Sequence, residues 1–135
     1  MKFFERTRDP GLLLLRVGIG GMFMIHGWPK LAGGAVKWQK LGAAMAQLGL
    51  DFWPTMWGFM AACSEFFGGL LLAAGLLFRP AAAALLSTMI VASVMHLKNG
   101  DGFTSASHAI EAGILFAALI LIGPGRYALQ PDKPA

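Results

Sequence analysis

The stretch MWGFMAACSEFFGGLLLAAGLLF, residues 56–78, contains one charged side chain, Glu65. A membrane-spanning helix needs about 20 mostly apolar residues, so this stretch predicts a helix that crosses a bilayer. Glu65 lies eleven residues after Pro54 and fourteen before Arg79, and a rise of about 1.5 Å per residue places it near the bilayer midplane. A charged side chain that faces lipid there costs at least ~2.5–3.5 kcal/mol. We therefore expect Glu65 to face protein or water.

Three further apolar runs are long enough to span a membrane, at residues 11–28, 81–97 and 106–122. The chain is 56% apolar and only 13% charged, which is typical of a membrane protein. These features predict an all-α, integral membrane four-helix bundle that forms a single domain over residues 1–135. Between the first two spans, the segment Lys37–Leu50 has apolar residues at helical spacing, which predicts a short helix in the membrane interface.

The connections between the predicted spans contain recognisable helix boundaries. Phe78-Arg79-Pro80 is predicted to form the turn between the second and third spans, because proline suits the first turn of a helix. Ser105 or Ser107 is expected to cap the last span. Gly123-Pro124-Gly125 is expected to end it.

The basic residues predict the orientation of the chain and argue against a nucleic-acid partner. With four spans both termini lie on the same side, which would hold six basic residues against four on the other side. The six are Lys2, Arg6, Arg8, Arg79, Arg126 and Lys133, and the four are Lys30, Lys37, Lys40 and Lys98. The positive-inside rule then favours cytoplasmic termini. Since these residues flank spans and do not cluster on a soluble face, they do not indicate nucleic-acid binding.

Arg16 is the first candidate partner for Glu65, because it lies inside the first span and has a long side chain. In one interpretation an Arg16–Glu65 pair only fixes the packing of two helices, since an unpaired buried charge is costly. In the other, Glu65 is a functional carboxylate that handles protons or substrate. Both interpretations remain open at the level of sequence.

A second carboxylate, Glu111, interrupts the last span, with Ser107 and His108 one turn earlier. The predicted topology places His26, His96 and His108 on the non-cytoplasmic side, where they would converge with the two carboxylates. Histidine and carboxylate ligands bind iron or zinc in some helix bundles. No pair here has the Glu-x-x-His order of di-iron bundles, so a metal is a weaker hypothesis than a quinone or another organic ligand. Lys30 is expected to extend to the interface or to contact an anionic substrate or quinone headgroup.

Three blocks of the sequence resemble the DoxX family of small bacterial inner-membrane proteins. The first, LLLLRVGIGGMFMIHGWPKLAGG at residues 12–34, has an arginine inside the span and a lysine at its close. The second is SEFFGGLLLAAGLLFRPAAAALL at residues 64–86, and the third is EAGILFAALILIGPGRYAL at residues 111–129. The family often has a serine and an aspartate after the final glycine-rich turn, where this chain has Ala128 and Gln130.

The resemblance implies a four-helix protein of the bacterial inner membrane that works with membrane oxidoreductases. Related subunits belong to quinone-reducing thiosulfate oxidation, and others associate with oxidative-stress and sulfur-transfer enzymes. The expected function is therefore a membrane subunit of an oxidoreductase system, in which Glu65, Glu111 and Arg16 act on protons or substrate. His26, Lys30, His96 and His108 are the candidate binding residues. The alternative is a non-catalytic anchor for peripheral enzymes. Membrane lipid and either a partner enzyme or a second copy are the expected partners.

Overall fold

The computed structural model describes residues 2–132, with side chains from Thr7 onward. Lys133 therefore lies outside the described residues, as do the side chains of Lys2 and Arg6. The elements in chain order are α1 (Lys2–Leu31), α2 (Gly34–Gly42), the 3₁₀ helix η1 (Ala43–Leu48), α3 (Pro54–Ala74), α4 (Phe78–Asn99) and α5 (Phe103–Ile122). Four helices are long and apolar enough to cross a membrane, namely α1 from Thr7, α3, α4 and α5. The predicted all-α, four-span membrane fold with a short helix after the first span is confirmed.

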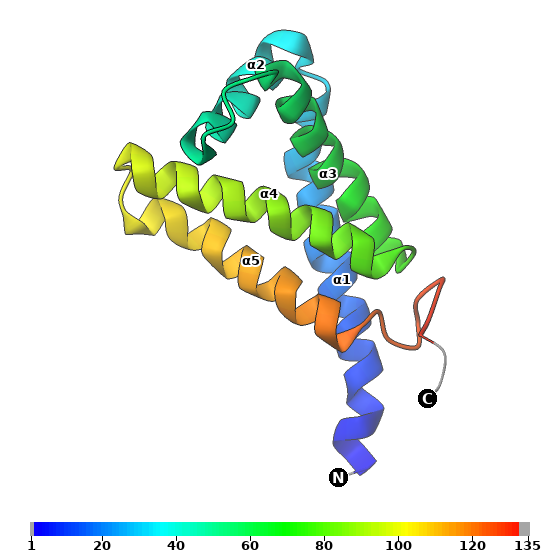
Figure 1. The fold of residues 1–135 in the computed structure, drawn as a ribbon. Coiled ribbons are helices and arrows are strands. Elements are labelled where there is room, and N and C mark those ends of the chain that lie inside the picture. Colours follow the sequence, from blue (N-terminus) through cyan, green and yellow to red (C-terminus); the bar gives the residue numbers. More distant parts are fainter. Residues whose placement is uncertain (1, 133–135) are drawn as a thin grey trace.

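The four long helices form two pairs (Figure 1). α1 packs along α3, α4 packs along α5, and α3 joins the two pairs by contacting α4. The α4–α5 pair crosses α1 steeply and does not lie nearly parallel to it. The short α2 and η1 pack against α3, and η1 also contacts α4.

Glycines set the close contact between α1 and α3. A Cβ added at Gly20 would lie 2.5 Å from the carbonyl oxygen of Gly69, and one at Gly27 would lie 2.5 Å from the backbone nitrogen of Phe66. Both distances are shorter than any real carbon contact, so only glycine permits this approach. Gly18, in contrast, faces open space. The contacts at Gly20 and Gly27 fix the register of the two helices.

The α2–η1 segment also packs through glycine. A Cβ at Gly42 would overlap the backbone of Pro54, and one at Gly58 would overlap the backbone of Trp38. The segment begins at Gly34, before the predicted Lys37. Its second half is a 3₁₀ helix that ends at Gly49, which has a left-handed backbone with φ 81°.

Several helix boundaries differ from the expected ones. α3 ends at Ala74, because Gly75 adopts a left-handed conformation with φ 69° and caps it. The turn between α3 and α4 is thus residues 75–77, and Phe78-Arg79-Pro80 lies within the first turn of α4. α5 begins at Phe103, before the predicted serine caps; the Ser105 hydroxyl instead donates to the Asp101 carbonyl. α5 ends at Gly123, as expected.

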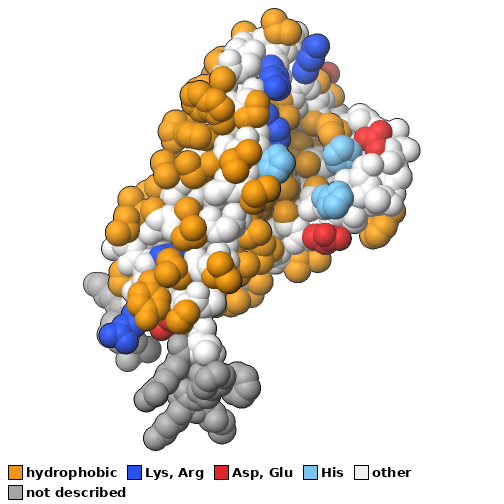
Figure 2. Space-filling view, turned by 180° about the vertical axis from the view of Figure 1, so that it is seen from behind, with side chains coloured by type: hydrophobic (Ala, Val, Ile, Leu, Met, Phe, Trp, Pro, Cys, Tyr) orange, Lys and Arg blue, Asp and Glu red, His pale blue; other side chains and the backbone are white. Residues whose placement is uncertain are grey.

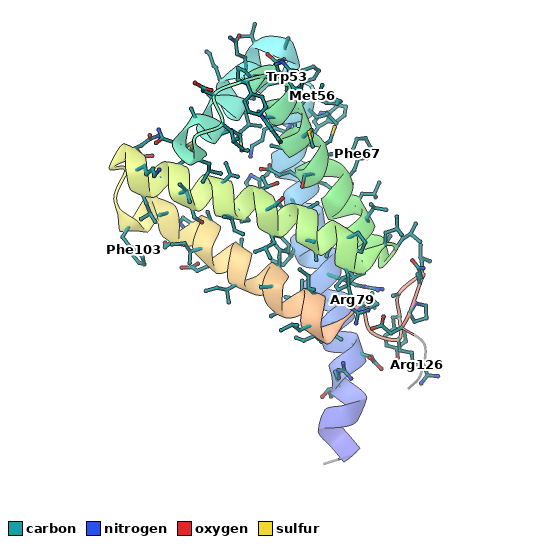
Figure 3. The ribbon with its side chains drawn as sticks, in the orientation of Figure 1. Trp53, Met56, Phe67, Arg79, Phe103 and Arg126 are labelled. Carbon is teal, nitrogen blue, oxygen red and sulfur yellow. The ribbon has the colours of Figure 1, made fainter. Side chains whose placement is uncertain are left out.

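The segment after α5 folds back onto the α3–α4 turn. The Leu129 and Gln130 amides donate to the carbonyls of Ala74 and Gly75, at 3.1 and 3.0 Å. The Gln130 side-chain oxygen accepts from the Leu77 amide at 3.2 Å, at the start of α4. Arg79 and Asp132 form an exposed two-contact ion pair at 2.6 and 2.9 Å, and Figure 3 shows Arg79 beside this segment.

The apolar core lies where the two helix pairs meet. Its fully buried side chains come from α3, α4 and α5, and Phe23 of α1 reaches them through an edge-to-face contact with Phe116 at 4.9 Å. These core side chains are Leu72, Leu85, Phe116 and Leu119. The core therefore holds the α4–α5 pair against the α1–α3 pair. The α2–η1 segment lies away from this core, against α3 and the end of α4.

Candidate functional site

An open cleft of about 780 Å³ lies between the α2–η1 segment, α3 and α4. Most of its wall is apolar, and Leu41 and Met45 line it from the α2–η1 side. Polar side chains in the wall come from α1, α3 and α4. They are Lys30, Ser64, Glu65, Ser87, Thr88 and His96. The volume falls within the ~300–1,000 Å³ that small-molecule sites usually have, and a few polar groups in an apolar wall are typical of such sites.

Lys30 and Glu65 form an ion pair in the wall of this cleft. The Lys30 Nζ donates to both carboxylate oxygens of Glu65, at 2.7 and 2.6 Å. The Glu65 side chain is only 3% exposed, whereas the Lys30 side chain is 33% exposed. Two of the three ammonium hydrogens of Lys30 are directed at Glu65, which leaves one donor for a ligand. Glu65 thus faces protein, as expected from its position in the span.

The expected Arg16–Glu65 pair is wrong, and the glycine contacts explain why. Gly27 packs against the backbone of Glu65 and Phe66, whereas Gly20 packs against Gly69 and Ala73. Because α1 and α3 are antiparallel, Arg16 lies beyond the end of α3 and Lys30 lies near Glu65. Helical side chains also lean toward the N-terminus of their own helix. Lys30 therefore leans toward Glu65, and Arg16 leans away from it.

Arg16 instead binds the segment after α5. It is 2% exposed, and its guanidinium donates to the carbonyl oxygen of Pro124 at 3.2 Å and to that of Tyr127. Its Nε has no hydrogen-bond partner among the described residues. A Cβ at Gly75 would collide with the Arg16 side chain, so Gly75 is needed both for the turn and for the space beside Arg16. These contacts assign Arg16 a structural role far from the cleft.

Two further contacts order the polar side of the cleft. The Trp38 indole donates to the Lys30 carbonyl at 3.0 Å, and that carbonyl belongs to the last turn of α1, where intrahelical partners are lacking. The Thr88 hydroxyl donates to the Ser64 hydroxyl at 3.2 Å and to the Ala84 carbonyl at 3.1 Å. Sequence inspection missed these residues. The lean of helical side chains was the one signal that favoured Lys30 over Arg16.

The remaining candidate residues do not all reach the cleft. His96 lines it, and its Nδ1 lies 2.8 Å from an oxygen of the exposed Asp101. His26, His108 and Glu111 are exposed on the surface of the chain. Figure 2 shows the three histidines on one face of the molecule. Within the described residues, however, no three His, Cys, Asp or Glu side chains are close enough to hold a metal ion. Of the three histidines and two carboxylates that were expected to converge, only Glu65 and His96 line the cleft.

The fold and the cleft define a small multi-pass membrane protein with an ion pair inside its spanning region. The DoxX family model matches residues 11–98, which is more than half of the chain, and the chain belongs to the DoxX family. This confirms the resemblance noted in the sequence. No curated protein and no solved structure matches the chain.

Proposed function

We propose that this DoxX-family protein is a membrane subunit of an oxidoreductase system that binds a quinone or a similar small molecule in the cleft. The observation that supports this most is the Lys30–Glu65 ion pair in an otherwise apolar wall. An apolar wall suits the ring of such a ligand, and the third hydrogen of Lys30 suits its oxygen atom.

Lys30 and Glu65 would also supply protons to this ligand. Reduction of a quinone to a quinol takes up two electrons and two protons. In this proposal the electrons come from a partner reductase, and the protons pass through polar groups of the cleft. The ammonium of Lys30 is the group placed to donate a proton, and the carboxylate of Glu65 stabilises it. His96 at the other end of the cleft, with Asp101 beside it, is the group placed to exchange protons with water.

Native mass spectrometry of the full chain in lipid nanodiscs, loaded with a short-chain benzoquinone, tests this proposal. We expect the wild-type chain to retain the quinone and Glu65→Gln to retain it roughly tenfold more weakly, because Lys30 then loses the charged partner that holds its ammonium in the cleft wall. Asp51→Asn is the matched control, because Asp51 is exposed and does not line the cleft. Circular dichroism must show that Glu65→Gln remains helical. No quinone on the wild-type chain, or equal retention by Glu65→Gln, would contradict the proposal.

The alternative function is a non-catalytic anchor for peripheral enzymes. It is supported by the outward side of α2, where Val36, Lys37 and Lys40 are exposed. Exposed basic residues of this kind attract an acidic protein surface. If so, replacing Lys37 and Lys40 by glutamine would release a partner enzyme from membranes, and Glu65→Gln would not.

A further inference from the structure

The outward face of α5 has polar side chains within a membrane span. Five exposed residues recur at helical spacing along one side of the helix, which we call the α5 stripe. They are Thr104, His108, Glu111, Ile114 and Leu121. The opposite side, which includes Ala109, Gly113 and Phe116, is buried. Half of the α5 stripe is thus suited to lipid, and the other half is not.

Glu111 and His108 have no hydrogen bond or ion pair within the described part of the chain. Glu111 is eight residues from the start of α5, which is about 12 Å along the helix. Ionisable side chains in membrane spans almost always face protein or a water-filled cavity. Neither residue lines the cleft described above, and a second protein surface in the membrane would cover both.

We propose that a second copy of this chain covers the α5 stripe. Two copies with the same orientation in the membrane are related by a two-fold axis along the membrane normal, so their α5 helices meet at the same depth. A two-fold interface must be self-complementary. The α5 stripe meets this condition, because His108 and Glu111 are one turn apart. The His108 of each copy then lies diagonally opposite the Glu111 of the other, which gives two equivalent polar contacts.

Other open faces of the chain do not require a partner in the same way. Gly18 and Gly21 of α1 have no atoms near the position of a Cβ, but they leave no polar group unsatisfied. Ile90 on α4 is 52% exposed and is satisfied by lipid. Among the side chains of residues 7–132, the α5 stripe combines exposure, a span and two side chains of complementary chemistry. This inference does not depend on the proposed quinone binding.

Exchanging His108 and Glu111 by mutation, and measuring the mass of the protein in lipid nanodiscs, tests the interface directly. The wild-type chain should have twice the 14.3 kDa mass of one copy. His108→Glu places four carboxylates together and should weaken the dimer by roughly tenfold to a hundredfold, given the strength of interhelical polar contacts. Combining His108→Glu with Glu111→His restores the complementary pair and should restore the dimer. A monomeric wild type, or a dimer that His108→Glu does not weaken, would overturn the proposal.

Cysteine cross-linking locates the interface without changing its polar residues. In a Cys63→Ala background, Ile114→Cys on the α5 stripe should form a disulfide-linked dimer in native membranes. Ile90→Cys, which is similarly exposed on α4, should not. This measurement decides the question even if the charge variants fail to insert. Cross-linking through Ile90→Cys alone, or capture of a different protein by Ile114→Cys, would show that a second copy does not cover this face.

Discussion

Lys30 and Glu65 differ in how far water reaches them, and this difference determines what each contributes to stability. The Glu65 side chain is almost completely buried, whereas a third of the Lys30 side chain is exposed. Without Glu65, the ammonium of Lys30 can turn toward water. Without Lys30, the Glu65 carboxylate has no comparable escape. The two members of one ion pair are therefore not equivalent.

This asymmetry predicts the ranking of three variants. Lys30→Met leaves a buried, unpaired carboxylate and should lower the free energy of unfolding by about 3–5 kcal/mol. Glu65→Met should cost less, since Lys30 keeps access to water. The double variant should be more stable than Lys30→Met alone, because apolar side chains can replace a buried ion pair at little cost. Denaturant titration in detergent micelles measures all three. A double variant as unstable as the sum of the single ones would contradict this account.

The sequence predicted that Glu65 faces protein but not which cation it meets. Arg16 and Lys30 are fourteen residues apart on α1, and either could reach Glu65 for some register of α1 against α3. That register depends on which glycines make the contact. Gly20 and Gly27 do so, whereas Gly18 faces open space. Composition does not distinguish these glycines, so the pairing required the structure.

At the level of elements, glycines hold the α2–η1 segment against α3, and their contacts predict which substitutions separate the two. A methyl group at Gly58 would overlap the backbone of Trp38, and the backbone cannot yield as a side chain can. Gly58→Ala should therefore cost about 1–3 kcal/mol or more. Gly18→Ala is the control, because no atom lies within 4 Å of the added carbon. It should be neutral or slightly stabilising, since alanine favours a helix.

Hydrogen exchange separates this local effect from general destabilisation. Gly58→Ala should speed exchange at the amides of α2 more than at those of α5, because only α2 loses its packing surface. Equal stability of Gly58→Ala and Gly18→Ala would show that α2 does not pack closely on α3.

The contacts of Arg16 lead to a second prediction at the level of elements, which concerns hydrogen exchange in the segment after α5. A lysine at this position has one nitrogen and cannot donate to the carbonyls of both Pro124 and Tyr127. Arg16→Lys should therefore speed exchange of the Leu129 and Gln130 amides by roughly tenfold, because these amides bind the end of α3 only while the segment is held in place. Arg126→Lys is the control, since Arg126 is exposed. No change in exchange would mean that backbone contacts alone hold the segment.

At the scale of the whole molecule, the arrangement of helices follows partly from sequence. The four spans were predictable because apolar runs of sufficient length have few alternatives in a chain of this composition. The steep crossing of the two helix pairs was not, because it depends on contacts between helices that composition does not reveal. The α2–η1 segment, packed on α3, forms one wall of the cleft. The outward position of Glu111 was also missed, because the polar side of a membrane-spanning helix was expected to face the interior of the bundle.

The orientation of the chain in the membrane is the last prediction. Backbone hydrogen bonds hold the α3–α4 turn beside the segment after α5, at one end of the molecule. At the second end, Lys98 of α4 binds the Gln47 carbonyl of η1. With four spans the sequence assigns six of the ten basic residues counted above to the first end, so this end should face the cytoplasm. In a Cys63→Ala background, an impermeant thiol reagent should label Asp51→Cys in intact cells and Arg126→Cys only after permeabilisation. The opposite pattern would place Lys30 and His96 toward the cytoplasm, and any reductase that serves the cleft would then have to work from that side.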